Sequence, residues 1–148
     1  MKYTYGKLSA TMNDWLENQA EYFELLAFVN KVFEKEGFKL SSDIAPPKMR
    51  QVHFIGENTN DYIFCVDNAD QIYINDKIRG RRLACAIIVA LIHYYSKNLY
   101  PVNEEAAAVT RGEILDKLDV SLTLSELAVT SAGVAGGILI LKSIFSKL

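Results

Sequence analysis

The chain has 148 residues, of which 50% are hydrophobic and 23% are charged, and its formal net charge is −2. This length and composition are typical of one globular domain, and they exclude disordered, collagen-like and disulfide-scaffold proteins. Because basic and acidic residues nearly balance, no overall field attracts nucleic acid or an anionic membrane. We therefore expect a single domain over residues 1–148 and no nucleic-acid partner.

The cysteines and the N-terminal residues indicate the cellular compartment in which we expect the protein. Cys65 and Cys85 each lie inside an apolar run, which is typical of small buried side chains in a reducing compartment. The segment Met1 to Lys7 lacks the apolar stretch of a secretory signal. We expect a cytoplasmic protein.

Residues 1–49 are expected to hold a long helix and a connection. The helix is predicted over about residues 12–36, after Thr11 and Asp14, which resemble a capping box, and it ends at Gly37. Pro46 and Pro47 then mark the connection. Two sets of residues, mostly apolar, recur near helical spacing. The first set is Leu16, Phe23, Leu26, Ala27, Asn30 and Phe33, and the second, which widens the apolar face, is Trp15, Tyr22, Leu25, Val29 and Val32.

Residues 50–117 are expected to form the central part of the domain. Short alternating runs separated by turn residues predict a small antiparallel β-meander of two or three strands. The almost continuous apolar run from Leu83 to Ile92 predicts a buried central helix, and Asn103 can cap a further helix. The predicted strands cover 51–55, 61–66 and 71–75, and the predicted helices cover 81–97 and 104–117.

Three segments in this central part resemble the zinc metallopeptidases of the ImmA/IrrE type. The first is Gln71-Ile-Tyr-Ile-Asn75, and an arginine-bearing stretch, Arg79-Gly-Arg-Arg82, follows it. The run from Ala86 to Tyr94 is similar to the family helix that carries the HExxH motif, with His93 at the spacing of its second histidine. The segment from Asn103 to Leu115 is similar to the helix that supplies the family's glutamate ligand. The resemblance implies a zincin-like α+β fold.

Carried over residue by residue, the resemblance implies an incomplete zinc site. His93 takes the place of the second histidine, and Glu105 or Glu104 that of the third ligand. Val89 stands where the family has its first histidine, and Ala90 where it has the general base. A zinc peptidase needs three protein ligands and a group that takes a proton from water. The fold is therefore expected without the chemistry, with no metal or other cofactor and these positions forming a vestigial cleft.

Without the resemblance, His93 has a simpler interpretation. It is then a histidine on a buried helix that is hydrogen-bonded to a neighbour, and no site is implied. His53 lies on the face of its predicted strand opposite Val52 and Phe54, which is typical of a solvent-facing residue.

Residues 118–148 form an apolar segment that is expected to be helical. Leu127 to Leu141 carries no charge, and Thr123 and Glu126 resemble a capping box before it. Fifteen helical residues reach about 22 Å, short of the roughly 30 Å core of a bilayer. The expected helix docks on its own domain or forms an interface, with membrane contact the least favoured. The interface candidates are Leu127, Val134, Ile138, Leu139, Leu141 and Phe145.

The combined prediction is one α+β domain with a long N-terminal helix, a small antiparallel meander, a buried central helix and a helical C-terminal part. The first functional hypothesis is a non-catalytic protein-binding or regulatory module on a degenerate metallopeptidase-like fold, compatible with a phage or mobile-element origin. Its partner is another protein or a second copy. The alternative is a structural subunit of a larger assembly, such as a virion, and an active enzyme comes third.

Overall fold

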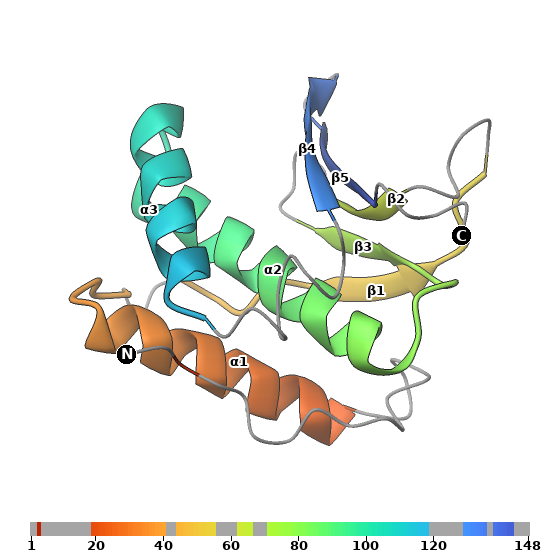
Figure 1. Cartoon of the computed structure of the whole chain (residues 1–148), viewed down its shortest axis with the longest axis horizontal. Coiled ribbons are helices and arrows are strands. Elements are labelled where there is room, and N and C mark those ends of the chain that lie inside the picture. The colour runs from red at the N-terminus through yellow and green to blue at the C-terminus, as the bar shows by residue number, and fades with distance from the viewer. Residues whose placement is uncertain are drawn as a thin grey trace.

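The computed structural model contains helices and strands in the expected mixture, so the α+β class is confirmed (Figure 1). It describes Tyr3 and residues 19–40, 44–55, 62–66, 71–118, 129–135 and 138–143. In chain order the elements are α1 (Gln19–Lys35), β1 (Met49–Val52), β2 (Tyr62–Val66), β3 (Ile72–Asn75), α2 (Gly80–Leu99), α3 (Glu104–Asp116), β4 (Val129–Ala135) and β5 (Ile138–Ser143).

The strands form a mixed sheet in the order β1-β3-β2-β5-β4. The strand β1 pairs with β3 in parallel, with Met49 opposite Ile72, whereas β2 pairs with β3 in the antiparallel direction. The prediction of an antiparallel meander is therefore wrong for β1, which does not lie beside β2. Apolar alternation indicates that a segment is a strand, but it fixes neither the partner nor the direction of pairing.

The C-terminal segment corrects a second prediction, because residues 129–135 and 138–143 are strands and not a helix. β4 and β5 pair in the antiparallel direction with Ala135 opposite Ile138, and β5 continues the sheet beside β2. The physical reason is visible in the sequence. Glycine is costly inside a helix, and Gly136-Gly137 between two apolar runs is a common hairpin signal.

The helix α2 is the centre of the hydrophobic core. Every residue from Leu83 to Ser96 is buried, as the apolar run predicted. In Figure 1 α2 lies between α1 and the sheet, and α3 packs against it. On β3, Ile72 and Ile74 are fully buried because alternate strand residues share one face. None of the described helices combines the length and the apolarity needed to cross a bilayer.

The helix α1 ends as predicted at Gly37, which has a φ of +87°. The amide of Phe38 donates to the carbonyl of Phe33 at 2.9 Å, and the amide of Gly37 donates to Glu34 at 3.1 Å. These two bonds form a Schellman motif, whose usual apolar contact is the edge-to-face pair of Phe33 and Phe38 at 6.1 Å. The predicted start of this helix, residues 12–18, lies outside the described residues.

The buried face of α1 follows the second predicted set of apolar positions. Tyr22, Leu25, Val29 and Val32 are buried, as are Leu26 and Phe33 of the first set, whereas Phe23 and Ala27 are exposed. The connection after α1 is fixed by two tyrosines. The hydroxyl of Tyr22 donates to the carbonyl of Pro47 at 3.1 Å, and that of Tyr94 donates to Ala45 at 2.6 Å.

Replacing Phe33 with alanine tests this packing. Phe33 is fully buried and also contacts the Tyr95 ring edge to face, so Phe33→Ala should lower the free energy of unfolding by about 3–5 kcal/mol. The matched control is Phe23→Ala on the same helix, since Phe23 is 59% exposed, and it should cost about 0.5 kcal/mol or less. Urea unfolding measures both, and equal losses would contradict the packing described.

Candidate functional site

Val89 and Ala90, which the resemblance described above would align with a first zinc ligand and a general base, lie in the packed part of α2. Their exposed fractions are 1% and 0%. Neither side chain carries a nitrogen, oxygen or sulfur atom that could bind a metal ion or accept a proton. These two positions therefore contribute packing to the core and no wall to an open cleft.

His93 lies one turn further along α2 and is also buried, with an exposed fraction of 8%. Burial and, to a smaller extent, the positive charge of Arg111 on α3 together lower the pKa of its imidazole from 6.5 to about 3. His93 is therefore neutral at neutral pH. The positively charged guanidinium of Arg111 also repels any metal cation that approaches this imidazole.

Glu104 and Glu105 begin α3 and are exposed. Asn103 caps this helix as predicted, because its Oδ1 atom accepts a hydrogen bond from the amide of Ala106 at 3.0 Å. The two carboxylates then lie in the first turn, where the helix dipole favours negative charge. Glu105 faces a groove whose described lining does not include Val89, Ala90 or His93. The structure therefore does not bring the five candidate positions into one cleft.

The residues present do not fit a zinc ion. Two of the required groups are apolar, His93 has an arginine as its charged neighbour, and Glu105 lines a different part of the surface. Among the described residues no three His, Cys, Asp or Glu side chains come together as a metal site would require.

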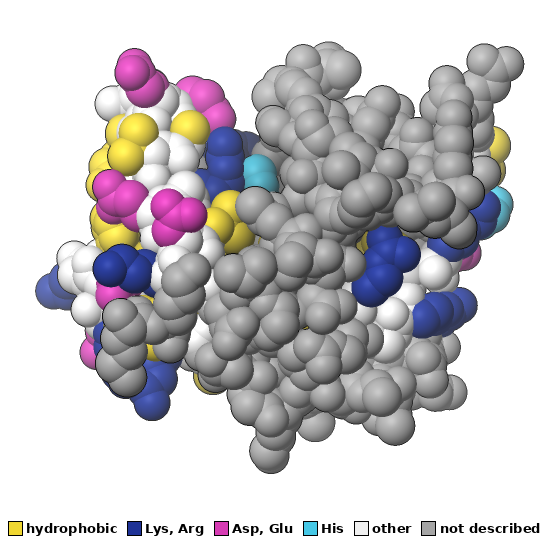
Figure 2. Space-filling view, in the orientation of Figure 1, with side chains coloured by type: hydrophobic (Ala, Val, Ile, Leu, Met, Phe, Trp, Pro, Cys, Tyr) yellow, Lys and Arg dark blue, Asp and Glu magenta, His cyan; other side chains and the backbone are white. Residues whose placement is uncertain are grey.

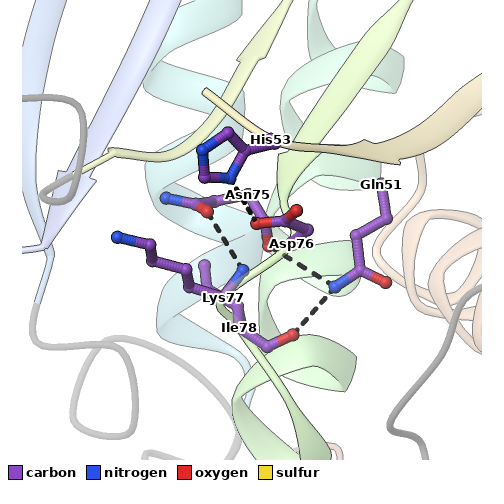
Figure 3. Close-up of polar contacts among 6 residues, drawn as sticks. All are labelled: Gln51, His53, Asn75, Asp76, Lys77 and Ile78. Carbon is purple, nitrogen blue, oxygen red and sulfur yellow. Dashed lines mark hydrogen bonds and ion pairs between the residues drawn. The ribbon is translucent and has the colours of Figure 1, made fainter. Parts of the chain in front are cut away.

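A second group of polar residues lies where the parallel strands β1 and β3 end (Figure 3). The amide nitrogen of the Gln51 side chain donates to the carbonyls of Ile78 at 2.9 Å and Asn75 at 3.4 Å. The Oδ1 atom of Asn75 accepts from the amide of Lys77 at 3.0 Å, which is an Asx turn. These contacts fix the turn from β3 into α2.

His53 and Asp76 complete this polar group, with His53 Nδ1 and Asp76 Oδ1 3.4 Å apart (Figure 3). The His53 side chain is 63% exposed, so the solvent-facing prediction is confirmed. An ion pair at such exposure contributes little to stability. Asn75, the last residue of the Ile-Tyr-Ile-Asn segment, thus has a structural role in the turn that is independent of any peptidase chemistry.

The groove at α3 has a volume of about 420 Å³. One wall comes from α3, where Glu105, Val109 and Glu113 repeat at every fourth residue and therefore share a face. The other wall comes from the ends of α1 and α2 and includes Phe38 and Tyr100. The full described lining is Phe38, Tyr100, Asn103, Glu105, Ala106, Val109, Thr110 and Glu113.

This groove is not among the sites predicted from the sequence, although the sequence of α3 indicates part of it. A valine flanked at four-residue spacing by two glutamates on a short capped helix marks an exposed face with both apolar and acidic character. The aromatic wall had no sequence signal, because Phe38 reaches α3 only through the turn at Gly37 and the packing of α1 on α2.

Four of the six predicted C-terminal interface residues lie in strands and not in the predicted helix. Val134 lies in β4, and Ile138, Leu139 and Leu141 lie in β5, so their backbones pair within the sheet. The helical interface predicted for them is wrong, since no helix is present there. Leu127 and Phe145 lie outside the described residues.

Comparisons of the chain with protein-family models, with curated proteins and with solved structures found no match.

The buried imidazole predicts a dependence of stability on pH. The folded-state pKa of His93, about 3, lies below its usual value of 6.5, so between these values the unfolded chain binds a proton that the folded chain does not. The contribution of His93 to the free energy of unfolding is therefore fully present above pH 6.5. It decreases as the pH falls toward 3, by up to about 1.4 kcal/mol per pH unit.

Denaturant unfolding from neutral to mildly acidic pH measures this effect. His93→Gln should remove a slope of that size from the pH dependence. An unchanged slope in the His93→Gln protein would show that the folded protein protonates His93 as readily as the unfolded chain does, and would contradict a desolvated imidazole.

Proposed function

We propose that the chain is a non-catalytic protein-binding module whose fold is a degenerate form of the ImmA/IrrE-type metallopeptidase fold. The order of strand, turn and buried helix, with Asn75 and His93 at the spacing quoted above, supports the family relationship. A cytoplasmic location belongs to the same proposal and is supported by Cys85, which is fully buried in the apolar core, as is typical of a cysteine in a reducing compartment.

The observation that carries this proposal is the packing of α2 at Val89 and Ala90. A peptidase helix of the HExxH type must leave one face open to the metal, water and substrate. Here the corresponding face is enclosed by other elements, and the remaining histidine is neutral and adjacent to an arginine. Such a helix stabilises a scaffold, and recognition of partners is then left to other surfaces.

Metal content tests the proposal directly. Purified full-length protein, loaded with zinc and then dialysed, should retain far less than one zinc per chain and should not cleave peptides. Retention of stoichiometric zinc, together with hydrolysis that a chelator abolishes, would show that the chain is a metallopeptidase and overturn the proposal.

Substitution of Ala90 tests whether this face of α2 is closed. Ala90→Glu restores the acidic residue of the family motif, but it places an unpaired carboxylate in the core and should cost at least about 3 kcal/mol of unfolding free energy. Ala27→Glu is the matched control because Ala27 is exposed on α1, and it should change stability by about 0.5 kcal/mol or less. Equal stability of the two variants would mean that position 90 faces an open cleft.

The alternative function, a subunit of a larger assembly, is favoured by one observation. β4 is the last strand in the sheet order, and its sequence from Val129 to Ala135 has no charge and no proline. An edge strand of this kind can pair with a strand of another chain. Light scattering over a range of concentrations distinguishes the two functions, because assembly through β4 predicts a growing mass that Ser131→Lys abolishes.

A further inference from the structure

We propose that the groove at α3 binds an amphipathic helix of a partner protein, one that presents an apolar residue between two lysines or arginines. This inference rests on the proposed function, since it names the partner chemistry of the protein-binding module. It is carried by the shape of the groove, by its charge and by the exposed valine at its centre.

The charge of α3 is strongly acidic compared with the rest of the chain. Its thirteen residues include four carboxylates and one arginine, so α3 carries a formal charge of −3, whereas the whole chain carries −2. The remaining residues together are therefore close to balanced, at +1. The acidic residues are Glu104, Glu105, Glu113 and Asp116.

These carboxylates are available to a partner. All four are exposed, and none forms an ion pair within the described part of the chain. Figure 2 shows acidic and hydrophobic side chains next to one another along α3 at the surface. The arginine of this helix, Arg111, is partly buried and its charge acts on His93 in α2. It therefore lies on a different face from Glu105 and Glu113 and does not neutralise the groove.

The apolar part of the groove provides the contact that holds a partner. Val109 is 57% exposed and lies between the two glutamates on the same face of α3. Phe38 and Tyr100 contribute aromatic surface to the opposite wall. Burial of a partner's leucine or isoleucine against these three side chains would remove apolar surface from water at each contact.

The spacing of the charges favours a helix as the occupant. Glu105 and Glu113 are eight residues apart, which is about 12 Å along α3. On an amphipathic partner helix, basic residues seven or eight positions apart lie on one face at a similar separation, with an apolar residue midway. The groove wall on this side is itself a helix, so no strand edge is offered for an extended peptide.

A second groove, of about 400 Å³, is also lined by Phe38 and does not have this character. Its described lining includes one acidic and one basic side chain, Glu34 and Lys39, so its charges oppose each other. It therefore gives no preference for a basic partner, and the α3 groove is the one that selects by charge.

The experiment uses the full chain and three labelled peptides of about five helical turns each. The first peptide has leucines and lysines arranged as an amphipathic helix, the second has glutamate in place of lysine, and the third has the first composition in scrambled order. Fluorescence anisotropy measures binding at low and raised salt. We expect binding of the first peptide alone, with an affinity that falls as salt increases.

Matched charge reversals locate the contact. Glu113→Lys and Glu105→Lys should each weaken binding about tenfold, because an attraction becomes a repulsion at a groove wall. Val109→Ser should also weaken binding of the peptide, because it removes apolar surface without changing the charge of the groove. Glu24→Lys is the control, since Glu24 is exposed on α1 about 16 Å before the end of that helix, and it should leave the affinity within about twofold.

Other outcomes overturn this inference in distinguishable ways. Equal binding of the glutamate peptide or of the scrambled peptide would contradict a basic helix as the partner. A loss of affinity in Glu24→Lys equal to that in Glu113→Lys would contradict it as well. Self-association that Glu113→Lys abolishes would make a second copy the occupant. In each of these cases the non-catalytic binding function stands. Zinc-dependent hydrolysis of peptides would instead contradict the proposed function, regardless of the results of the binding experiments.

Discussion

The helix α2 has no solvent-facing side between Leu83 and Ser96, so neighbouring elements must supply its surroundings, and among those that the structure describes α1, α3, β2 and β3 contact it. The helix α1 covers one side, β3 presents Ile72 and Ile74 to another, and α3 packs near its C-terminal half through Ala107, Thr110 and Ile114. Each of these elements gains its own apolar burial only while α2 is present, because α1 and the sheet lie on opposite sides of it (Figure 1). The whole arrangement therefore depends on one enclosed helix.

The groove at α3 follows from where the helices end. Gly37 turns the chain after α1 with a positive φ, so that Phe38 folds back against Phe33 and reaches the groove wall. The helix α2 ends at Tyr100, and three residues later Asn103 caps α3 with its own side chain. Aromatic surface is thus placed at helix ends by backbone capping, and the acidic face of α3 is placed opposite to it. The groove is built from local turn chemistry on a rigid core.

The helices could be predicted from the sequence to a much greater extent than the sheet. Apolar periodicity and the capping residues Gly37 and Asn103 act within a few residues, so they located the ends of α1 and α3 correctly. Strand pairing depends on segments far apart in the chain, and nothing local distinguishes a parallel from an antiparallel partner for β1. The C-terminal hairpin was missed for a different reason. Its uncharged small and apolar residues fit a helix or a strand, so composition alone does not decide between them.

The candidate site shows the same division between local and distant information. The apolar side chains of Val89 and Ala90, within the apolar run of α2, predict burial, and both residues are buried. The sequence could not show that Arg111, eighteen residues after His93, brings its charge to bear on that imidazole, since this depends on how α3 packs on α2. Nor could it show that Glu105 lines another surface. Tertiary packing decides which charges meet, and sequence spacing does not.

The enclosed helix also explains why a binding surface would lie on α3. Once α2 is surrounded, none of its central side chains is accessible to a partner, and its remaining contact with solvent is near its ends. In contrast, α3 buries only the face that carries Ala107, Thr110 and Ile114 and exposes the others. A helix packed on one side keeps a rigid backbone and still presents a full row of side chains, which lowers the entropy lost when a partner binds. The enclosure of the buried part of α2 and the presentation of an acidic face on α3 are therefore two consequences of the same packing.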